Sequence, residues 1–135
     1  MDKVLFAHNS GDWETPQVLF DSLNKEFTFT LDVCASKENA KCKKFFTKEQ
    51  DGLKQKWGGA MCWCNPPYGR QIYEWVKKAS TENCVLLLPA RTDTKWFHEF
   101  VYGKAEIRFI KGRLKFGNSN NSAPFPSMVV VFRNG

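Results

Sequence analysis

The stretch AMCWCNPPYG, residues 60–69, shows most clearly how this chain of 135 residues folds. Residues 60–64 are a short apolar run typical of a buried strand. The prolines at 66 and 67 end it, because neither can donate to a β-ladder. Residues 70–80 are then predicted to form a helix whose apolar face is Ile72, Trp75, Val76 and Ala79. A buried strand, a rigid turn and an amphipathic helix together form one unit of an α/β sheet.

The residues before this stretch predict a second such unit. Residues 15–26 are expected to form a helix that Thr15 caps and Pro16 begins. Its apolar face would be Leu19, Phe20, Leu23 and Phe27. Residues 28–34 alternate in the way a strand does, and a short polar helix at 37–43 and a short strand around 45–46 are expected to follow.

The residues after the stretch predict the rest of the sheet. Residues 84–88 (CVLLL) are a continuous apolar run, typical of a strand that is covered on both faces. Asp93 or Thr94 can cap a following helix whose inner face is Phe97, Phe100 and Val101. Two strands at 105–116 and 127–132, with a polar loop at 117–122 (GNSNNS) between them, predict an antiparallel hairpin. The expected fold class is therefore α/β, a compact sheet flanked by helices and ending in an antiparallel β-hairpin.

Length and composition predict one globular domain over residues 1–135. The chain has no apolar run long enough to span a membrane and no signal-peptide pattern, so a cytoplasmic location is expected. Twenty Lys and Arg against 14 Asp and Glu give a net charge of +6, which weakly favours a polyanionic partner. The five cysteines lack the spacing of a zinc site, and His8 lies far from His98 in the chain, so reduced thiols and no metal are expected.

Asn65-Pro66-Pro67-Tyr68 is the segment that indicates chemistry. Ligands of open α/β sheets bind beyond the carboxyl ends of the strands, which is where Asn65 is expected. The Asn65 side-chain oxygen and the Pro66 carbonyl would make two rigid acceptors for one NH₂ group. Tyr68 would offer a flat face to a planar base or amide. The alternative is a proline-stiffened turn with a tyrosine in the core, but the strand before it and the helix after it favour the functional interpretation.

Four further segments extend this pattern into a resemblance. The tetrapeptide resembles the catalytic motif of amino-methyltransferases, and Trp13-Glu14-Thr15-Pro16 resembles the N-terminal element of that family. Residues 31–36 (LDVCAS) are similar to its first cofactor motif, and residues 51–53 (DGL) to its acidic position for the cofactor adenine. With LLLPARTDTKWFHE at 86–99, residues 13–132 as a whole resemble the small phage-type DNA N6-adenine methyltransferases, which are Dam-related.

The resemblance implies a Rossmann-like methyltransferase sheet and a site-specific DNA methyltransferase of the phage or restriction-modification kind. It would move a methyl group from S-adenosylmethionine to adenine N6, leave S-adenosylhomocysteine as product and need no metal. The catalytic residues would be Asn65, Pro66, Pro67 and Tyr68. The adenine would have to be flipped out or single-stranded, because a base inside a duplex cannot reach such a pocket. The residues implied for the cofactor are Trp13, Thr15, Pro16, Asp32, Cys34, Ala35, Asp51 and Asn65.

Residues near the predicted final hairpin are candidates for DNA contacts. Lys111, Arg113 and Lys115 alternate, and a change in the phase of the apolar residues predicts a bulge near Gly112 that turns these cations outward. Arg91 is expected near the ligand edge, where it would hold a phosphate or form a salt bridge to Asp93 or Glu99. Two aromatic residues that flank the loop, Phe116 and Phe125, either cover the second face of the base or pack in the core.

Other functions remain open at this stage. The same chemistry would serve cytosine N4, RNA or a protein glutamine amide. Residues 33–36 contain no glycine where the cofactor motif usually has a glycine-rich loop. This departure favours the other alternative, a nucleic-acid-binding module without catalysis. No separate target-recognition domain is expected, so sequence specificity would come from loops such as 117–126 or from a second copy in a homodimer.

Overall fold

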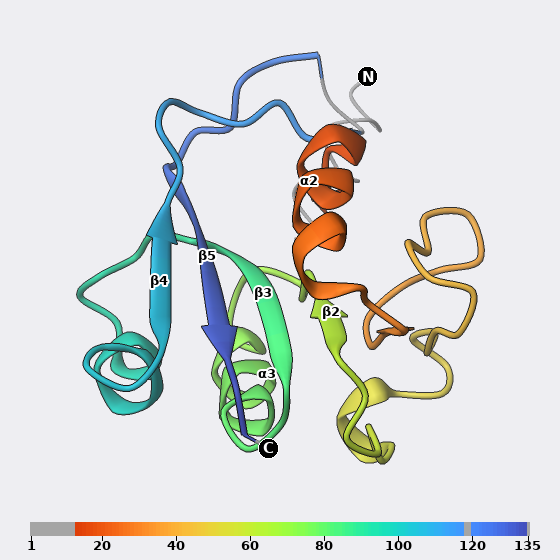
Figure 1. Ribbon diagram of the computed structural model, residues 1–135. Coiled ribbons are helices and arrows are strands. Elements are labelled where there is room, and N and C mark those ends of the chain that lie inside the picture. The colour runs from red at the N-terminus through yellow and green to blue at the C-terminus, as the bar shows by residue number, and fades with distance from the viewer. Residues whose placement is uncertain (1–12, 118–119, 135) are drawn as a thin grey trace.

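A five-stranded mixed sheet forms the centre of the computed structural model, which describes residues 13–117 and 120–134 (Figure 1). The strands are β1 (Leu31–Asp32), β2 (Cys62–Cys64), β3 (Cys84–Pro89), β4 (Glu106–Phe109) and β5 (Ser127–Phe132), in the order β1-β2-β3-β5-β4. β1, β2 and β3 are parallel, and β5 pairs antiparallel with both β3 and β4. The carboxyl ends of β1 to β4 therefore meet at one edge of the sheet, together with the start of β5.

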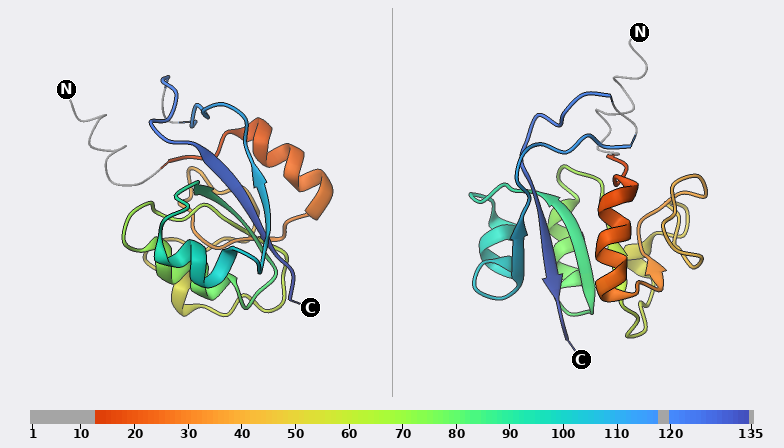
Figure 2. Two further views of the ribbon diagram at one scale, coloured as in Figure 1. Left: turned by 90° about the vertical axis from the view of Figure 1, so that its left-hand side faces the viewer. Right: turned by 45° about the horizontal axis from the view of Figure 1, so that its top comes forward.

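Helices cover both faces of this sheet (Figure 2). α2 (Gln17–Phe27) packs on one face through Phe20 and Leu23, against Trp63 of β2. α3 (Ile72–Ala79) and the short π-helical turn η2 (Phe97–Val101) pack on the other. The apolar faces predicted for α2 and α3 are confirmed. The predicted burial of 84–88 on both faces is also confirmed, because successive β3 side chains enter opposite layers of the core.

Two predictions about the start of α2 are wrong. The helix begins at Gln17 rather than at Pro16, whose ψ of 131° is extended. No side chain caps it, so Thr15 is not its cap. The Pro16 carbonyl instead starts the helix by accepting from the Phe20 N–H at 3.1 Å. The cap residue of η2 itself, Trp96, makes no side-chain capping bond, but Thr94 Oγ1 just before it accepts from the Phe97 N–H at 3.4 Å.

The segment that follows α2 has less regular structure than the sequence predicts. The strand expected at 28–34 is reduced to Leu31–Asp32, since Thr28 already adopts a left-handed φ of 54° after the helix. Residues 37–43 form turns and bends rather than a helix. The strand expected around 45–46 is a single parallel bridge between Asp32 and Phe45. A short 3-10 helix, η1 (Gly52–Lys54), ends this region.

The expected strand at 105–116 ends at Phe109. Gly112 has a φ of 78° in a bend beyond the strand, so there is no bulge within a ladder at this point. The phase change in the sequence marks where the chain leaves the sheet. β4 and β5 do pair antiparallel, but residues 110–126 join them, a connection far longer than a hairpin turn. This long connection lies above the start of α2 in Figure 1.

The described part of the chain contains no helix long and apolar enough to cross a membrane. Within the same residues, no group of three or more His, Cys, Asp or Glu side chains is placed to hold a metal ion, and His8 lies outside them. Cys42, Cys62, Cys64 and Cys84 carry free thiols. Cys62, Cys64 and Cys84 are buried in the core, and burial raises the pKa of the Cys62 and Cys64 thiols.

A candidate active site at the carboxyl edge of the sheet

Asn65 directly follows β2 and is held by the segment that precedes α2. Its Nδ2 donates to the Trp13 carbonyl oxygen and to Thr15 Oγ1, the latter at 3.0 Å. A main-chain carbonyl can only accept, so the NH₂ end of the amide has to face Trp13. The Asn65 Oδ1 atom therefore points the other way.

That oxygen is an unsatisfied acceptor. Asn65 Oδ1 is buried and has no hydrogen-bond partner among residues 13–117 and 120–134. Leaving a buried polar group unpaired costs about 1–3 kcal/mol, so such atoms are rare and call for an explanation. An acceptor of this kind at the carboxyl end of a central strand is suited to a ligand that carries an N–H donor.

Pro66 and Pro67 carry the chain from Asn65 toward α3 without contributing to the helix. The first carbonyls that accept from α3 belong to Gly69 and Gln71, in hydrogen bonds from Ile72 and Trp75 at 3.2 Å each. The Pro66 carbonyl thus precedes the helical hydrogen bonds. This arrangement agrees with the predicted rigid turn between the strand and the helix.

Tyr68 is anchored rather than freely exposed. Its hydroxyl donates to the Leu87 carbonyl oxygen at 3.0 Å, and burial raises its pKa well above the ordinary value. Its ring makes edge contacts with Phe116 and Phe125, at centroid distances of 6.3 and 5.6 Å. Trp13 contacts the same two phenylalanines at 5.3 and 5.4 Å. We call these four rings the aromatic cluster.

The two phenylalanines of the aromatic cluster differ in burial. Phe116 is 1% exposed and belongs to the core beneath α2. Phe125 is half-buried, and the Arg91 guanidinium lies 5.8 Å from its ring centroid. Of the two, Phe125 is the ring nearer to solvent and to a cation.

Asp32 organises the loop that follows β1. The buried carboxylate accepts from the backbone N–H groups of Cys34, at 3.3 Å, and Lys41, at 3.0 Å. Burial raises the pKa of Asp32 to about 6, although these hydrogen bonds oppose the shift. The Ala35 N–H bonds to the Phe46 carbonyl at 3.0 Å. The glycine-free loop is therefore held together by its own polar groups, which offers a physical explanation for its lack of glycine.

The structure brings the Asp51-Gly52-Leu53 segment against the end of β1. A Cβ atom on Gly52 would stand 2.1 Å from the Val33 carbonyl oxygen, so only glycine fits there. The Trp57 Nε1–H donates to the Gly52 carbonyl at 2.9 Å and fixes it further. One Asp51 carboxylate oxygen, Oδ1, accepts from the Leu53 N–H at 3.1 Å. Val33 and Asp51 are 18 positions apart in the sequence. The close approach of Gly52 to Val33 nevertheless brings the two segments together.

The predicted DNA-contacting cations lie beyond the sheet. Lys111, Arg113 and Lys115 are all exposed in the connection 110–126 rather than on a strand. Arg113 Nη1 reaches the Ala123 carbonyl at 3.4 Å. Arg91 is exposed, and within residues 13–117 and 120–134 no ion pair joins it to Asp93 or Glu99.

Sequence reasoning missed the contact between Thr15 and Asn65. The two residues are 50 positions apart, and the sequence indicates Thr15 only as a helix cap and, through the family resemblance, as a cofactor contact. No local pattern signals such a contact. For Gly52 a signal does exist, since a glycine beside an acidic residue at a turn often marks a close backbone approach.

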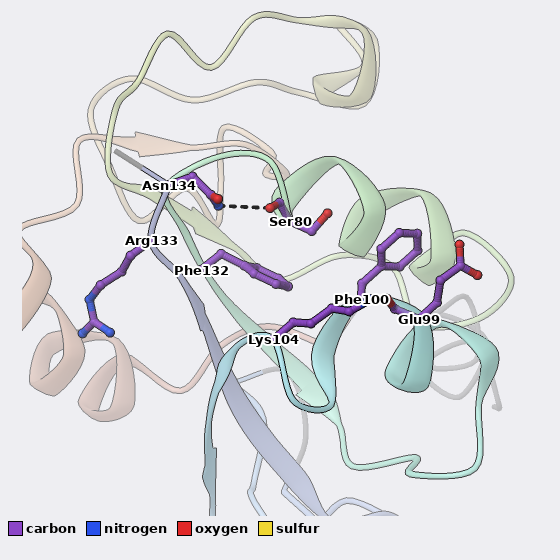
Figure 3. A pocket seen from close by; sticks show the side chains of 7 residues that line it. All are labelled: Ser80, Glu99, Phe100, Lys104, Phe132, Arg133 and Asn134. Carbon is purple, nitrogen blue, oxygen red and sulfur yellow. Dashed lines mark hydrogen bonds between the residues drawn. The ribbon is translucent and has the colours of Figure 1, made fainter.

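A cavity of about 500 Å³ lies elsewhere, at the opposite edge of the sheet (Figure 3). Phe132 near the end of β5 and Ser80 after α3 line it, and Asn134 Nδ2 donates to the Ser80 carbonyl across it at 3.0 Å. None of the predicted site residues lines this cavity.

Comparison with known proteins identifies a family that this chain resembles over nearly its whole length. A model of the family described as DNA N-6-adenine-methyltransferase (Dam) matches residues 5–134. The chain is similar to the DNA N-6-adenine-methyltransferase of Haemophilus phage HP1, with 34% identity over 134 aligned positions that cover 89% of this chain and 77% of the phage protein. It is also similar to the protein of the same name from Escherichia phage T1, with 38% identity over 109 positions. That match covers 76% of this chain but only 45% of the T1 protein.

Proposed function

Because the chain belongs to the DNA N-6-adenine-methyltransferase (Dam) family, we propose that Asn65 and Pro66 hold the adenine amino group while it receives a methyl group. Membership makes the chain an enzyme that methylates adenine N6 in DNA, with S-adenosylmethionine as the donor that the family uses. The proposal concerns which residues carry out this reaction and how.

The unpaired Asn65 Oδ1 is the observation that carries the proposal. The lone pair of an adenine amino nitrogen is delocalised into the ring, which makes it a poor nucleophile. Acceptors at Asn65 Oδ1 and the Pro66 carbonyl would bind both amino hydrogens and favour the pyramidal nitrogen of the transition state. Interactions that strengthen in the transition state raise the rate of the chemical step itself.

Tyr68 and Phe125 are the proposed stacking partners of the base. Tyr68 is anchored by Leu87 and stays in place, whereas Phe125 is half-buried in the connection 110–126. Their rings contact each other at 5.6 Å, so an adenine can enter only if Phe125 moves away from Tyr68. The adenine would arrive flipped out of the duplex or from a single strand. Phe116, which is 1% exposed, has the burial of a core residue and supports the pocket from below.

The cofactor is proposed to lie across the ends of β1 and β2. The fit rests on Asp51, whose second carboxylate oxygen can accept from an adenine amino group, and on Gly52, which holds Asp51 against Val33. Asp32 would act by shaping the loop that contains Cys34 and Ala35, because its own oxygens already accept from that loop. The bound cofactor supplies a methyl group that its sulfonium already activates. The protein residues then have to position the acceptor nitrogen in line with it.

The sheet supports a Rossmann-like assignment, which we include in the proposal. Three parallel strands with helices on both faces support it, because ligands of open α/β sheets bind beyond the carboxyl ends of the strands, where Asn65 follows β2. Exposed Lys111, Arg113 and Lys115 in the connection 110–126, together with Arg91, would meet DNA phosphates next to that edge.

The test measures transfer of labelled methyl from S-adenosylmethionine to DNA, followed by nucleoside analysis. We expect N6-methyladenine from the unaltered chain and only a small residual turnover from Asn65→Ala, with affinity for S-adenosylhomocysteine retained. Asn83→Ala, which removes an amide at the opposite edge of the sheet, is the matched control. Normal turnover by Asn65→Ala would refute the assignment of Asn65. Methylated cytosine, or DNA binding without any cofactor binding, would favour the alternative functions.

A further inference from the structure

We propose that Thr15 is a positioning residue for catalysis, which together with the Trp13 carbonyl keeps the Asn65 amide oriented with Oδ1 toward the substrate. The proposal rests on the function proposed above for Asn65. It assigns to Thr15 a role in orienting that side chain, in place of the helix-capping role that its position in the sequence indicates.

The contacts of Thr15 support this role directly. Thr15 is 5% exposed, and its hydroxyl lies 3.0 Å from Asn65 Nδ2. It makes no capping hydrogen bond to α2, so the hydroxyl is not needed by the helix. A threonine that caps a helix accepts from the first turn, whereas this hydroxyl accepts from a side chain on another element.

The orientation of the amide decides whether Asn65 can bind an amino group. An amide rotated by half a turn would present NH₂ to the substrate, and two donors facing each other repel. In the observed orientation Asn65 Nδ2 donates to both acceptors of the segment before α2, the Trp13 carbonyl and Thr15 Oγ1. Only Asn65 Oδ1 is then left to face the substrate. The rotated amide would place its oxygen against the Trp13 carbonyl oxygen. Trp13 thus excludes the wrong orientation, and Thr15 adds the second hydrogen bond that stabilises the right one.

The segment that carries these acceptors is itself held on two sides. The Glu14 carbonyl, between Trp13 and Thr15, accepts from the Gly117 N–H of the connection 110–126 at 2.9 Å. At the far end of α2, Glu26 makes a two-pronged ion pair with Arg108 of β4, both distances being 2.7 Å. These anchors keep the acceptors in register with the end of β2.

The same geometry makes the chain selective for asparagine at position 65. An aspartate would keep an oxygen toward the substrate but would place its second oxygen against the Trp13 carbonyl. The Thr15 hydroxyl can rotate and donate to a carboxylate, whereas a carbonyl cannot. We therefore expect Asn65→Asp to lose activity although it retains an acceptor.

The experiment compares Thr15→Val, which keeps the shape of the side chain, with Thr15→Ser, which keeps its hydroxyl. We expect Thr15→Val to lower kcat about 10- to 100-fold, the range typical of small misplacements of reacting groups. KM for DNA and the Kd for S-adenosylhomocysteine should stay within about threefold, since only the amide orientation changes. Thr15→Ser should recover most of the lost rate. Thr81→Val, which removes an exposed hydroxyl bonded to the Lys78 carbonyl, is the matched control.

A double-mutant cycle separates this inference from the proposed function. In an Asn65→Ala background, Thr15→Val should cause no further loss of kcat, because it acts through Asn65. Full kcat in Thr15→Val, or full activity in Asn65→Asp, would overturn the positioning role while leaving Asn65 as the catalytic residue. A loss in Thr15→Val that appears only as weaker binding of S-adenosylhomocysteine would also overturn it and would assign Thr15 to the cofactor. An active Asn65→Ala would instead defeat the proposed function itself.

Discussion

Gly52 lies directly against the main-chain carbonyl of Val33, where a Cβ atom would stand 2.1 Å from the oxygen. The same added Cβ atom would stand 3.0 Å from the Trp75 ring of α3. The contact joins the segment after β1 to η1 and lies next to Asp51. This contact between Gly52 and Val33 is the reason why Asp51 lies beside the end of β1, although the two are distant in the sequence.

Gly52→Ala is therefore expected to destabilise the protein. The added methyl has to push apart two backbone segments, which we expect to cost about 2–3 kcal/mol of unfolding free energy. Denaturant unfolding measures it. At Gly117 a Cβ would stand 3.4 Å from the movable Glu14 carboxylate, so Gly117→Ala is the control and should change stability by less than about 0.5 kcal/mol. Equal stability of the two variants would contradict the close approach.

Asp32 predicts a pH dependence of stability. Its pKa rises from 3.8 to about 6 on folding, so the folded protein binds the proton more tightly than the unfolded chain does. The unfolding free energy should accordingly fall by about 3 kcal/mol, from this group alone, as pH rises from 4 to 6. Above that pH it should level off. The Asp32→Asn variant lacks this titrating group. The difference between its profile of unfolding free energy against pH and that of the unaltered protein therefore gives the contribution of Asp32. Parallel profiles would show that the carboxyl keeps its ordinary pKa.

Phe116 and Phe125 should respond differently to truncation. Phe116→Ala removes a ring that is 1% exposed and should cost about 3–5 kcal/mol of stability. Phe125 is half-buried, so Phe125→Ala should cost less stability and mainly impair methyl transfer, through loss of base stacking. Thermal unfolding and steady-state kinetics on DNA distinguish the two effects. A Phe125→Ala enzyme with unchanged kinetics would remove that ring from the proposed base pocket.

The exposed cations of the connection 110–126 should set the salt dependence of DNA binding. Each phosphate contact contributes about 0.9 to the slope of log K against log salt concentration. Replacing Lys111, Arg113 and Lys115 by Gln should lower that slope by about 2 to 3. The control replaces three exposed lysines outside this connection, Lys25, Lys56 and Lys77, in the same way and should leave the slope unchanged. Equal slopes for both triple variants would exclude the connection from the DNA interface.

Local sequence patterns predicted the elements that depend on local forces. The buried run before Asn65, the prolines that end it and the apolar face of α3 are all present as expected, because burial and proline geometry act within a few residues. The continuous apolar run of β3 likewise predicted burial on both faces. Each of these features follows from side-chain type and spacing alone.

Distant hydrogen bonds explain where the predictions were wrong. Residues 37–43 have the composition of a short helix, but Asp32 captures the Lys41 N–H, and Ser36 and Asn39 bond to each other, which holds the segment in turns. Thr15 does not cap α2, because its hydroxyl accepts from Asn65, which is 50 positions away. The strand expected at 105–116 ends early, at Phe109, because its antiparallel partner β5 begins at Ser127, opposite that end. The Ser36–Asn39 bonds are local, but the partners of Thr15 and of the strand at 105–116 lie too far along the chain to be read from a local window.

The placement of β5 has a consequence for synthesis of the chain. β5 is made after every other strand, yet it lies between β3 and β4 and pairs with both. Until residues 127–132 leave the ribosome, the inner edges of β3 and β4 have no partner, and such open edges can pair with other chains. The nascent protein therefore completes its sheet in one late step, by inserting a strand rather than by adding one at the rim.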